Sequence, residues 1–270
     1  MTRRCGHLPA LWDAHRVTAV TGVALLAPLA LTIFERGAAM MMALGLAVGL
    51  AVMWQLVFAR LRGRPMGWDG IATALIFVLL LPGAVPLWHQ GLALSFGIVM
   101  GDQIFGGRGR GFVNPAVVGL AFLLFSFPGV TTGTPGPSVA IAAALGGALL
   151  LAVGLMSRRV IAGFGLGIAT LMVLLPDPEG WAALQSASLV LGLVFLIGDP
   201  VAAACTNAGR WFYGGLAGAL VVLLGHSGDG VGALASVVFA ALLASIFAPL
   251  IDQIVIWANI RRRARRQSHG

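Results

Sequence analysis

Long apolar runs, separated by short segments that carry nearly all of the charge, are the feature that most limits how this chain can fold. Ten runs stand out along the 270 residues: 17–34, 38–59, 70–87, 90–101, 112–128, 138–156, 160–175, 181–198, 207–225 and 231–257. A helix needs about 20 apolar residues to cross the hydrocarbon core of a bilayer. The runs therefore fill the chain and leave room only for short loops. We predict an all-α, polytopic membrane protein with about ten transmembrane helices.

The composition excludes the main alternatives to a membrane protein. Apolar residues make up 59% of the chain and charged residues 10%, whereas soluble domains average about 45–50% and about 25%. Disordered chains carry more charge and fewer apolar residues. The net charge of +8 would suggest a nucleic-acid partner in a soluble protein. Here every basic residue is an arginine in a short cluster between apolar runs, so we interpret the charge as a topology signal and expect no nucleic-acid partner.

Nearly all of the arginines lie in every second segment between the apolar runs. If the N-terminus is cytoplasmic, Arg36 is the one arginine in an outside segment. The others fall in inside segments: Arg3, Arg4, Arg16, Arg60, Arg62, Arg64, Arg108, Arg110, Arg158, Arg159, Arg210, Arg261, Arg262, Arg263, Arg265 and Arg266. Because basic residues gather in cytoplasmic loops, we predict that both termini are cytoplasmic.

We expect a single membrane domain over residues 1–270. Its parts would be a cytoplasmic N-terminus (1–16), a transmembrane bundle (17–257) and a basic cytoplasmic tail (258–270). The sequence RRRARR at 261–266 is expected to contact anionic lipid, since such clusters bind acidic headgroups next to a span.

Two runs, 90–101 and 160–175, are short for a full span, and short or interrupted segments often form broken helices at binding sites. Gly101-Asp102 follows one apolar run and Gly198-Asp199 follows another. The repeated Gly-Asp pair supports an internal duplication with broken helices.

The most informative stretch is 101–122, GDQIFGGRGRGFVNPAVVGLAF. Gly106 and Gly107 allow the backbone to bend or to approach a ligand closely, and Pro115 disfavours helix at Asn114. Non-helical backbone at membrane depth is tolerated only inside protein or along a cavity. The stretch is therefore either a cytoplasmic loop followed by a helix start or a broken-helix binding element, and the residues fit both.

Asp199, followed by Pro200, is the second candidate. An acidic residue near the membrane interior points to function, while the structural alternative is a carboxylate that caps the next helix. Asp252, in the last run, is expected to pair with an arginine or to line an ion path. Other carboxylates at predicted loop ends are expected to be solvated: Asp69, Asp177, Glu179 and Asp229.

These segments resemble, in order, the motifs of one family over about residues 60–255. The family pattern G-G-x-G-x-N-x-F-N-P-A, with a helix that ends in Phe-Pro, is matched by GGRGRGFVNPA at 106–116 and Phe127-Pro128; its later motifs are matched by GDPV at 198–201, Thr206, Gly209-Arg210, Tyr213-Gly214 and PLID at 249–252. The chain is similar to NqrB, a membrane subunit of the sodium-pumping NADH:quinone oxidoreductase (Nqr), and to RnfD of the Rnf ferredoxin:NAD oxidoreductase.

The resemblance implies a flavin-associated subunit of an electron transport complex in the bacterial inner membrane, with possible coupling to Na⁺ or H⁺ movement. Other membrane subunits and FMN-binding subunits would be its partners. The cofactor would be FMN, which a threonine in an outside loop of the family holds through a phosphoester bond, or riboflavin. The flavin would carry the redox chemistry.

This sequence departs from the family pattern at the flavin positions. Thr134, before Pro135, is the best match to the attachment threonine, but its loop is shortened and lacks the family's Asp and S-G-A-T residues. Gly111 replaces the first asparagine of the glycine pattern. These losses count against covalent FMN at Thr134 and leave Asn114, Asp199, Gly106 and Gly107 as candidate cofactor contacts.

Two other functions fit parts of the sequence. Asn114-Pro115-Ala116 is the tripeptide that aquaporin-like channels use at half-helix starts, so a channel or passive transporter, with a urea-channel-like duplicated fold, is one alternative. The motif losses favour another, a scaffold subunit that has no cofactor.

Overall fold

The computed structural model describes residues 14–63, 67–83, 85–107, 110–128, 135–175, 186–226 and 232–267. Over these ranges the chain is helical and contains no strand, which confirms the all-α prediction. The elements are α1 (Ala14–Arg36), α2 (Ala38–Arg62), α3 (Asp69–Leu79), α4 (Leu87–Ile98), η1 (Val99–Gln103), α5 (Pro115–Ser126), α6 (Pro137–Val153), α7 (Arg158–Leu174), α9 (Ala187–Gly192), η2 (Leu193–Ile197), α10 (Asn207–His226) and α11 (Ala233–Gln267). Because η1 continues α4 and η2 continues α9, the described residues form ten continuous helical segments, one for each apolar run.

Helix length separates the segments into two groups. Four helices, α1, α2, α10 and α11, are long and apolar enough to cross a membrane. The runs 90–101 and 160–175, which we expected to be short, fall outside this group. Four further runs that we expected to be full spans also form shorter helices, namely α3, α5, α6 and α9 with η2. The first two are especially short, since α3 has 11 residues and α5 has 12. Pro82 and Pro86 follow α3, and Pro115 begins α5, so prolines limit both helices.

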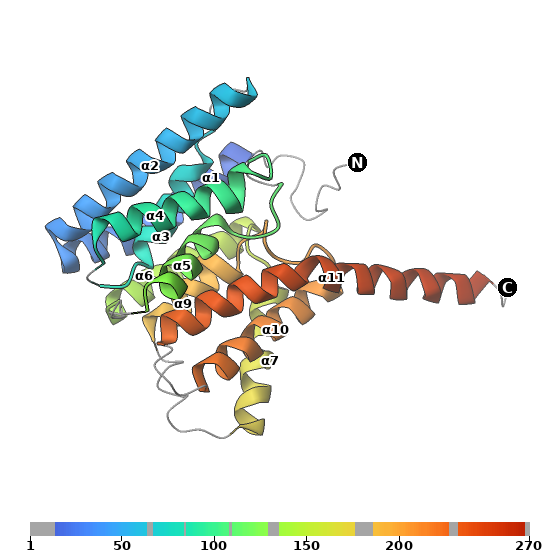
Figure 1. Ribbon diagram of the computed structural model, residues 1–270. Helices are drawn as coiled ribbons and strands as arrows, with labels where there is room; N and C mark the ends of the chain where they lie inside the picture. Colours follow the sequence, from blue (N-terminus) through green and yellow to red (C-terminus); the bar gives the residue numbers. More distant parts are fainter. Residues whose placement is uncertain are drawn as a thin grey trace.

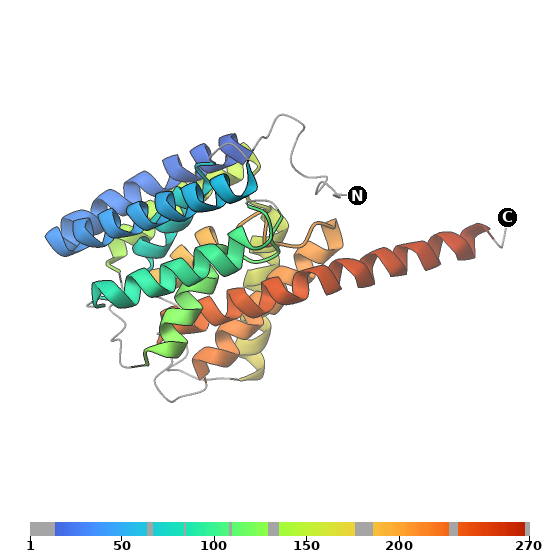
Figure 2. The same ribbon diagram turned by 45° about the horizontal axis from the view of Figure 1, so that its top comes forward.

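Three of the short helices lie in the middle of the molecule. Figure 1 shows α1, α2 and α4 on one side and α7, α10 and α11 on the other, with α3, α5 and α9 between them. Helix α1 packs on α6, α4 on α5, and α10 on both α7 and α11. The start of α1 and the end of α11 lie on the same side of the molecule (Figure 2).

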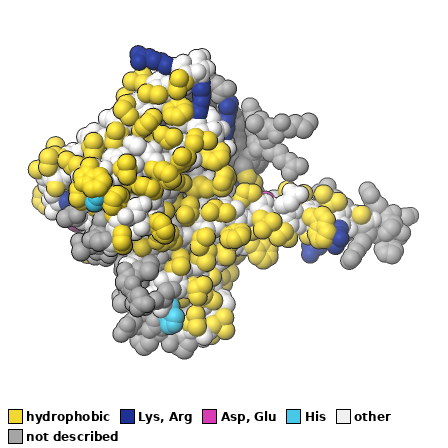
Figure 3. Space-filling model, in the orientation of Figure 1, with side chains coloured by type: hydrophobic (Ala, Val, Ile, Leu, Met, Phe, Trp, Pro, Cys, Tyr) yellow, Lys and Arg dark blue, Asp and Glu magenta, His cyan; other side chains and the backbone are white. Residues whose placement is uncertain are grey.

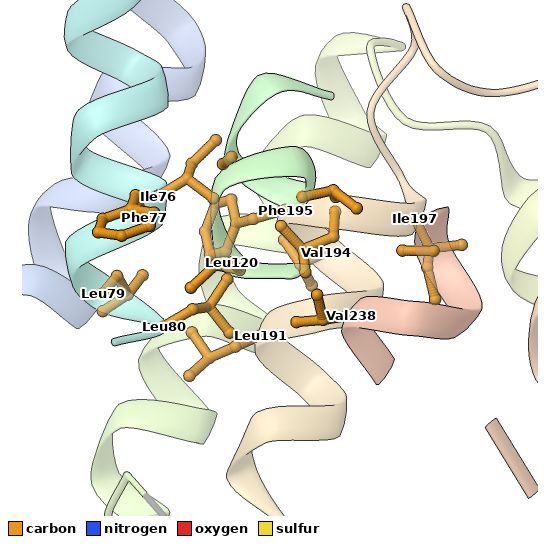
Figure 4. Packing of buried hydrophobic residues seen from close by; sticks show 14 of the residues in the cluster. Ile76, Phe77, Leu79, Leu80, Leu120, Leu191, Val194, Phe195, Ile197 and Val238 are labelled. Atoms are coloured by element: carbon orange, nitrogen blue, oxygen red, sulfur yellow. The ribbon is translucent and has the colours of Figure 1, made fainter. Parts of the chain in front are cut away.

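The centre of the bundle is a compact apolar core. Figure 4 shows Phe77 of α3, Leu120 of α5, Leu191 of α9, Ile197 of η2 and Val238 of α11 converging there. All five are at most 1% exposed. The inner faces of the short helices α3, α5 and α9 are therefore packed against protein, which allows helix ends to lie inside the bundle.

Glycine allows two of the central helices to approach closely. A Cβ on Gly97 of α4 would lie 2.6 Å from the carbonyl oxygen of Pro115, and a Cβ on Gly101 would lie 2.7 Å from Pro115 Cα. These obstacles are backbone atoms, which cannot move aside as a flexible side chain can. Glycine at 97 and 101 thus brings the end of α4 and η1 against the first residue of α5.

The outer surface is apolar, as a lipid-facing surface should be. The side chains of Phe34, Phe125 and Val173 are more than 80% exposed. In Figure 3 hydrophobic side chains cover most of the visible face, and the basic side chains gather at the end of α2 and towards the end of α11. A surface of this kind is stable only in contact with lipid or with other membrane subunits.

Candidate functional site

Two helices of the bundle end in a π-helical turn, η1 after α4 and η2 after α9. Their 1→6 hydrogen bonds include Ile104 N to Val99 O (2.9 Å) and Gly198 N to Leu193 O (2.8 Å). π-Helical turns are rare and occur frequently at functional sites. The last carbonyl groups of such a helix need other partners. Each of the two Gly-Asp pairs noted in the sequence falls in or directly after one of these turns.

Asn114 joins the two broken segments. It is 3% exposed and caps α5, because its Oδ1 accepts a hydrogen bond from the N–H of Ala116 (2.9 Å). Its Nδ2 donates to the carbonyl of Phe195 in η2 (3.1 Å) and to Oδ2 of Asp199 (2.9 Å). The stretch 101–122 is therefore both a helix start and part of a broken-helix element, the two alternatives that the sequence left open.

Asp199 does not cap the next helix. Its Oδ1 accepts from the N–H of Val201 (3.2 Å), but α10 begins only at Asn207. The capping alternative is wrong for this residue, and its carboxylate is directed instead to the junction with Asn114.

Asp102, in η1, belongs to a second polar chain. It is 7% exposed, and its Oδ2 accepts from Nε2 of Gln103 (3.0 Å). Arg62, at the end of α2, donates to both the side-chain and the backbone oxygen of Gln103 and lies over the ring of Phe58 (4.9 Å). The end of η1 is thus satisfied by a cation, whereas the end of η2 is satisfied by the neutral amide of Asn114.

A narrow cavity of about 20 Å³ lies between these groups. Its lining includes Asp69, Thr73, Asp102, Asn114 and Asp199. Its volume suits about one water molecule. We expected Asp69 to be solvated, and this was wrong, because the first turn of α3 turns its half-buried carboxylate towards the cavity and towards the hydroxyl of Thr18.

A larger polar cavity of about 220 Å³ shares Asp69 and Asp102 with the narrow one. Gly106 and Gly107 line it together with Arg110, and the guanidinium group of Arg62 and the ring of Phe58 complete its wall. Both glycines have a positive φ, 105° and 97°, which side chains with a Cβ rarely adopt. The glycines therefore form a turn whose open side is this cavity.

The structure brings four of the five predicted cofactor residues to one region. Gly106 and Gly107 line the larger cavity, and Asn114 and Asp199 line the narrow one. Thr134 lies outside the described residues. The predicted contact of each of the five residues with a cofactor remains a prediction. Sequence reasoning underrated Asp69 and Asp102, although the repeated Gly-Asp pair was a signal that could have identified Asp102.

A second carboxylate stabilises the start of α10. Asp252 of α11 accepts hydrogen bonds from the N–H groups of Cys205 (2.6 Å) and Thr206 (2.9 Å) and from the hydroxyl of Thr206 (2.6 Å). Thr206 Oγ1 in turn accepts from the N–H of Gly209 (3.0 Å). Asp252 also interacts electrostatically with Arg210, in line with the predicted arginine partner, while backbone and hydroxyl groups supply its hydrogen bonds.

A family model described as the NQR2, RnfD, RnfE family matches residues 2–137 and 129–261 of the chain. The NqrB subunit of the Na(+)-translocating NADH-quinone reductase of Pseudomonas aeruginosa (strain LESB58) is 30% identical, over 95% of this chain and 72% of that protein. The NqrB proteins of Ectopseudomonas mendocina (strain ymp) and Yersinia pestis are 31% and 29% identical, each over 79% of this chain and over 66% and 65% of those proteins.

Proposed function

The chain belongs to the NQR2, RnfD, RnfE family, and on this basis we propose that it is the flavin-associated integral membrane subunit of an Nqr- or Rnf-like electron transport complex that moves Na⁺ or H⁺. It is a membrane protein of the bacterial inner membrane, and we propose a single domain with both termini cytoplasmic. Its partners would be the other membrane and FMN-binding subunits of the complex. The basic tail would contact anionic lipid.

One observation carries the proposal of cation movement: three carboxylates line one cavity between two broken helices. Asp69, Asp102 and Asp199 line a space of about 20 Å³ together with the amide of Asn114, while no three acidic side chains of the described residues lie close enough together to hold a metal ion at once. Carboxylate and amide oxygens are ligands for hard cations, and ionisable residues inside a membrane protein mark ion pathways. We propose that a small cation passes these carboxylates in turn.

The larger cavity supports the proposal of a bound flavin. Arg62 and Arg110 would hold the carbonyl oxygens of the pyrimidine edge of the isoalloxazine ring, because guanidinium groups are donors only. The ring of Phe58 offers an apolar face beside them. The volume of about 220 Å³ is below the about 300–1,000 Å³ of drug-sized ligand sites, so the cavity suits the edge of the ring. A bound flavin would supply one- and two-electron chemistry.

The shared carboxylates connect the two cavities. Asp102 lines both spaces and is held by Gln103, which Arg62 positions. A change in charge in the larger cavity would therefore act on the carboxylates of the narrow one over a short distance of low dielectric. In this arrangement Asp102 holds the cation, and Arg62 and Gln103 set the position of Asp102.

The cation proposal is tested in proteoliposomes that contain the whole complex. With an electron donor present, the Asp102→Asn variant should need a higher Na⁺ concentration for half-maximal electron transfer and should take up less Na⁺. Glu35→Gln is the matched control. Glu35 is an exposed carboxylate that accepts a hydrogen bond from Ser138, and it lies at the C-terminal end of α1, away from the cavity. Equal Na⁺ dependence in wild type and Asp102→Asn would contradict the cation site.

The flavin proposal is tested by counting flavin in the purified complex. Arg110→Gln should lower the flavin that acid releases from the complex, and the exposed Arg158→Gln should leave it unchanged. A peptide containing Thr134 that carries the mass of FMN, absent in Thr134→Ala, would establish covalent attachment. A complex whose acid-released flavin is the same in the wild type and Arg110→Gln would contradict binding in the larger cavity.

A further inference from the structure

A third cavity lies away from this site, where α1 ends and α2 begins. Its volume is about 510 Å³. The turn between the helices lies on one side, and the segment before α4 lies on the other. Met40, Met42 and Leu87 give it an apolar wall, and the first is buried while the other two are exposed. The cavity therefore has an apolar floor and opens at the surface.

Arg36 places a positive charge at the rim of this cavity. The residue is half-buried and donates one hydrogen bond to the carbonyl of Leu81 (2.8 Å). A guanidinium group has five N–H donors, and a charge removed from water is stable only when it is paired. The neighbouring Glu35 is exposed, accepts from Ser138 and stabilises the charge of Arg36 electrostatically. An anion in the cavity would add a partner for the N–H groups of Arg36 that face it.

Gln90 lines the cavity and carries an acceptor that no described group uses. The residue is 6% exposed, and its Nε2 donates to the carbonyl of Val85 (2.8 Å). That bond fixes the orientation of the amide, because the opposite orientation would place two oxygens face to face. Its Oε1 is buried and has no hydrogen-bond partner among the described residues. A buried acceptor without a donor is unfavourable, so a small shift of this side chain towards a ligand hydroxyl or N–H donor in the cavity would be stabilising.

We propose that this cavity binds phosphatidylglycerol. The phosphate would pair with Arg36, a glycerol hydroxyl of the headgroup would donate to Gln90 Oε1, and the acyl chains would leave across Met42 and Leu87 into the bilayer. The lipid carries one negative charge, which neutralises the single positive charge of Arg36. Phosphatidylethanolamine also has a phosphate, but its ammonium group would bring a second positive charge close to Arg36, so we expect the site to prefer phosphatidylglycerol between these two lipids.

The test compares lipids that stay with the purified complex after extensive washing in mild detergent. Lipids are then extracted and phosphatidylglycerol and phosphatidylethanolamine are counted per complex by mass spectrometry. The wild type should retain one more phosphatidylglycerol than Arg36→Gln, and the site in the variant should hold it about tenfold more weakly, as expected for the loss of a charge-assisted contact. Arg36→Lys keeps the charge and should retain more lipid than Arg36→Gln.

Gln90→Glu provides a test that loss of folding cannot imitate. A carboxylate at this position would repel the phosphate and attract an ammonium group, so the retained lipid should change from phosphatidylglycerol to phosphatidylethanolamine. Arg60→Gln, an exposed arginine at the far end of α2, is the control for general contact with anionic lipid and should change neither count.

Two results would overturn the proposal. One is equal retention of phosphatidylglycerol in the wild type, Arg36→Gln and Gln90→Glu. The other is a loss of flavin from Arg36→Gln and Gln90→Glu with no change in lipid, which would assign the cavity to a flavin.

Discussion

The first turns of α5 and α10 are stabilised in the same way but lie in different surroundings. Each helix follows a broken segment and begins at a polar residue, Asn114 or Thr206, that is bonded to a carboxylate from a distant part of the chain. Asp252 receives three hydrogen bonds at the start of α10. Asp199 receives one from the backbone and one from Asn114, and it also lines a cavity with two other carboxylates.

The difference shows which of the two carboxylates is placed to meet a ligand. The donors around Asp252 are backbone and hydroxyl groups that complete a helix terminus, where a negative charge is favourable. Asp199 lines a cavity with two other carboxylates. The two helix starts therefore separate into one that holds the fold together and one that we propose to serve ion movement.

The close approach of α4 to α5 is where the largest effect is expected. Gly97→Leu would place side-chain atoms against the carbonyl of Pro115 and drive α4 from α5. We expect a loss of about 3 kcal/mol or more, at or beyond the usual range for overpacking, measured as a fall in melting temperature in detergent. Gly45→Ala, in α2, should be neutral or stabilising, because no atom lies within 4 Å of the place that its Cβ would take. Equal melting temperatures for the wild type and Gly97→Leu would show that the approach is not tight.

Removal of Asp252 should have the next largest effect. Asp252→Ala leaves three donors at the start of α10 without their acceptor and removes a favourable charge, and we expect a loss of about 2–3 kcal/mol. Asp252→Asn retains one acceptor oxygen and should lose about half as much. If thermal unfolding shows Asp252→Ala to be as stable as the wild type, the carboxylate does not stabilise the start of α10.

Removal of Asn114 should cost less stability than removal of Asp252. Asn114→Ala loses the cap of α5, worth about 1 kcal/mol, and releases Asp199 from its amide partner. Asn114→Ser keeps a capping oxygen, so it should be nearly as stable as the wild type. Its side chain is too short to reach Phe195, so the Na⁺ dependence of electron transfer should remain altered, as in Asn114→Ala. If Asn114→Ser restored both, the contact with Asp199 would be dispensable and the contrast between the two helix starts would fail.

The sequence allowed the class of fold and part of the site to be predicted. Apolar runs indicated ten helical segments because each helix in lipid must carry its own apolar surface, and this property is local in the sequence. The site was predicted through Asn114, Asp199, Gly106 and Gly107, since an Asn-Pro start and clustered glycines interrupt helix wherever they occur. The lengths of α3 and α5 were not predicted. An apolar residue in a buried turn cannot be distinguished, by its sequence, from an apolar residue in a membrane-spanning helix.

What only the tertiary structure decided is which polar groups meet. Asn114 and Asp199 are 85 positions apart, and Asp69 reaches the same cavity from a third segment that the sequence placed among solvated loop ends. The tertiary structure likewise decided that Asp252 accepts hydrogen bonds at the start of α10. It also placed Gln90 in the same cavity as Arg36. Apolar periodicity specifies that a residue lies in a helix, but hydrogen bonds between helices depend on packing at short range, which adjacent residues in the chain do not encode.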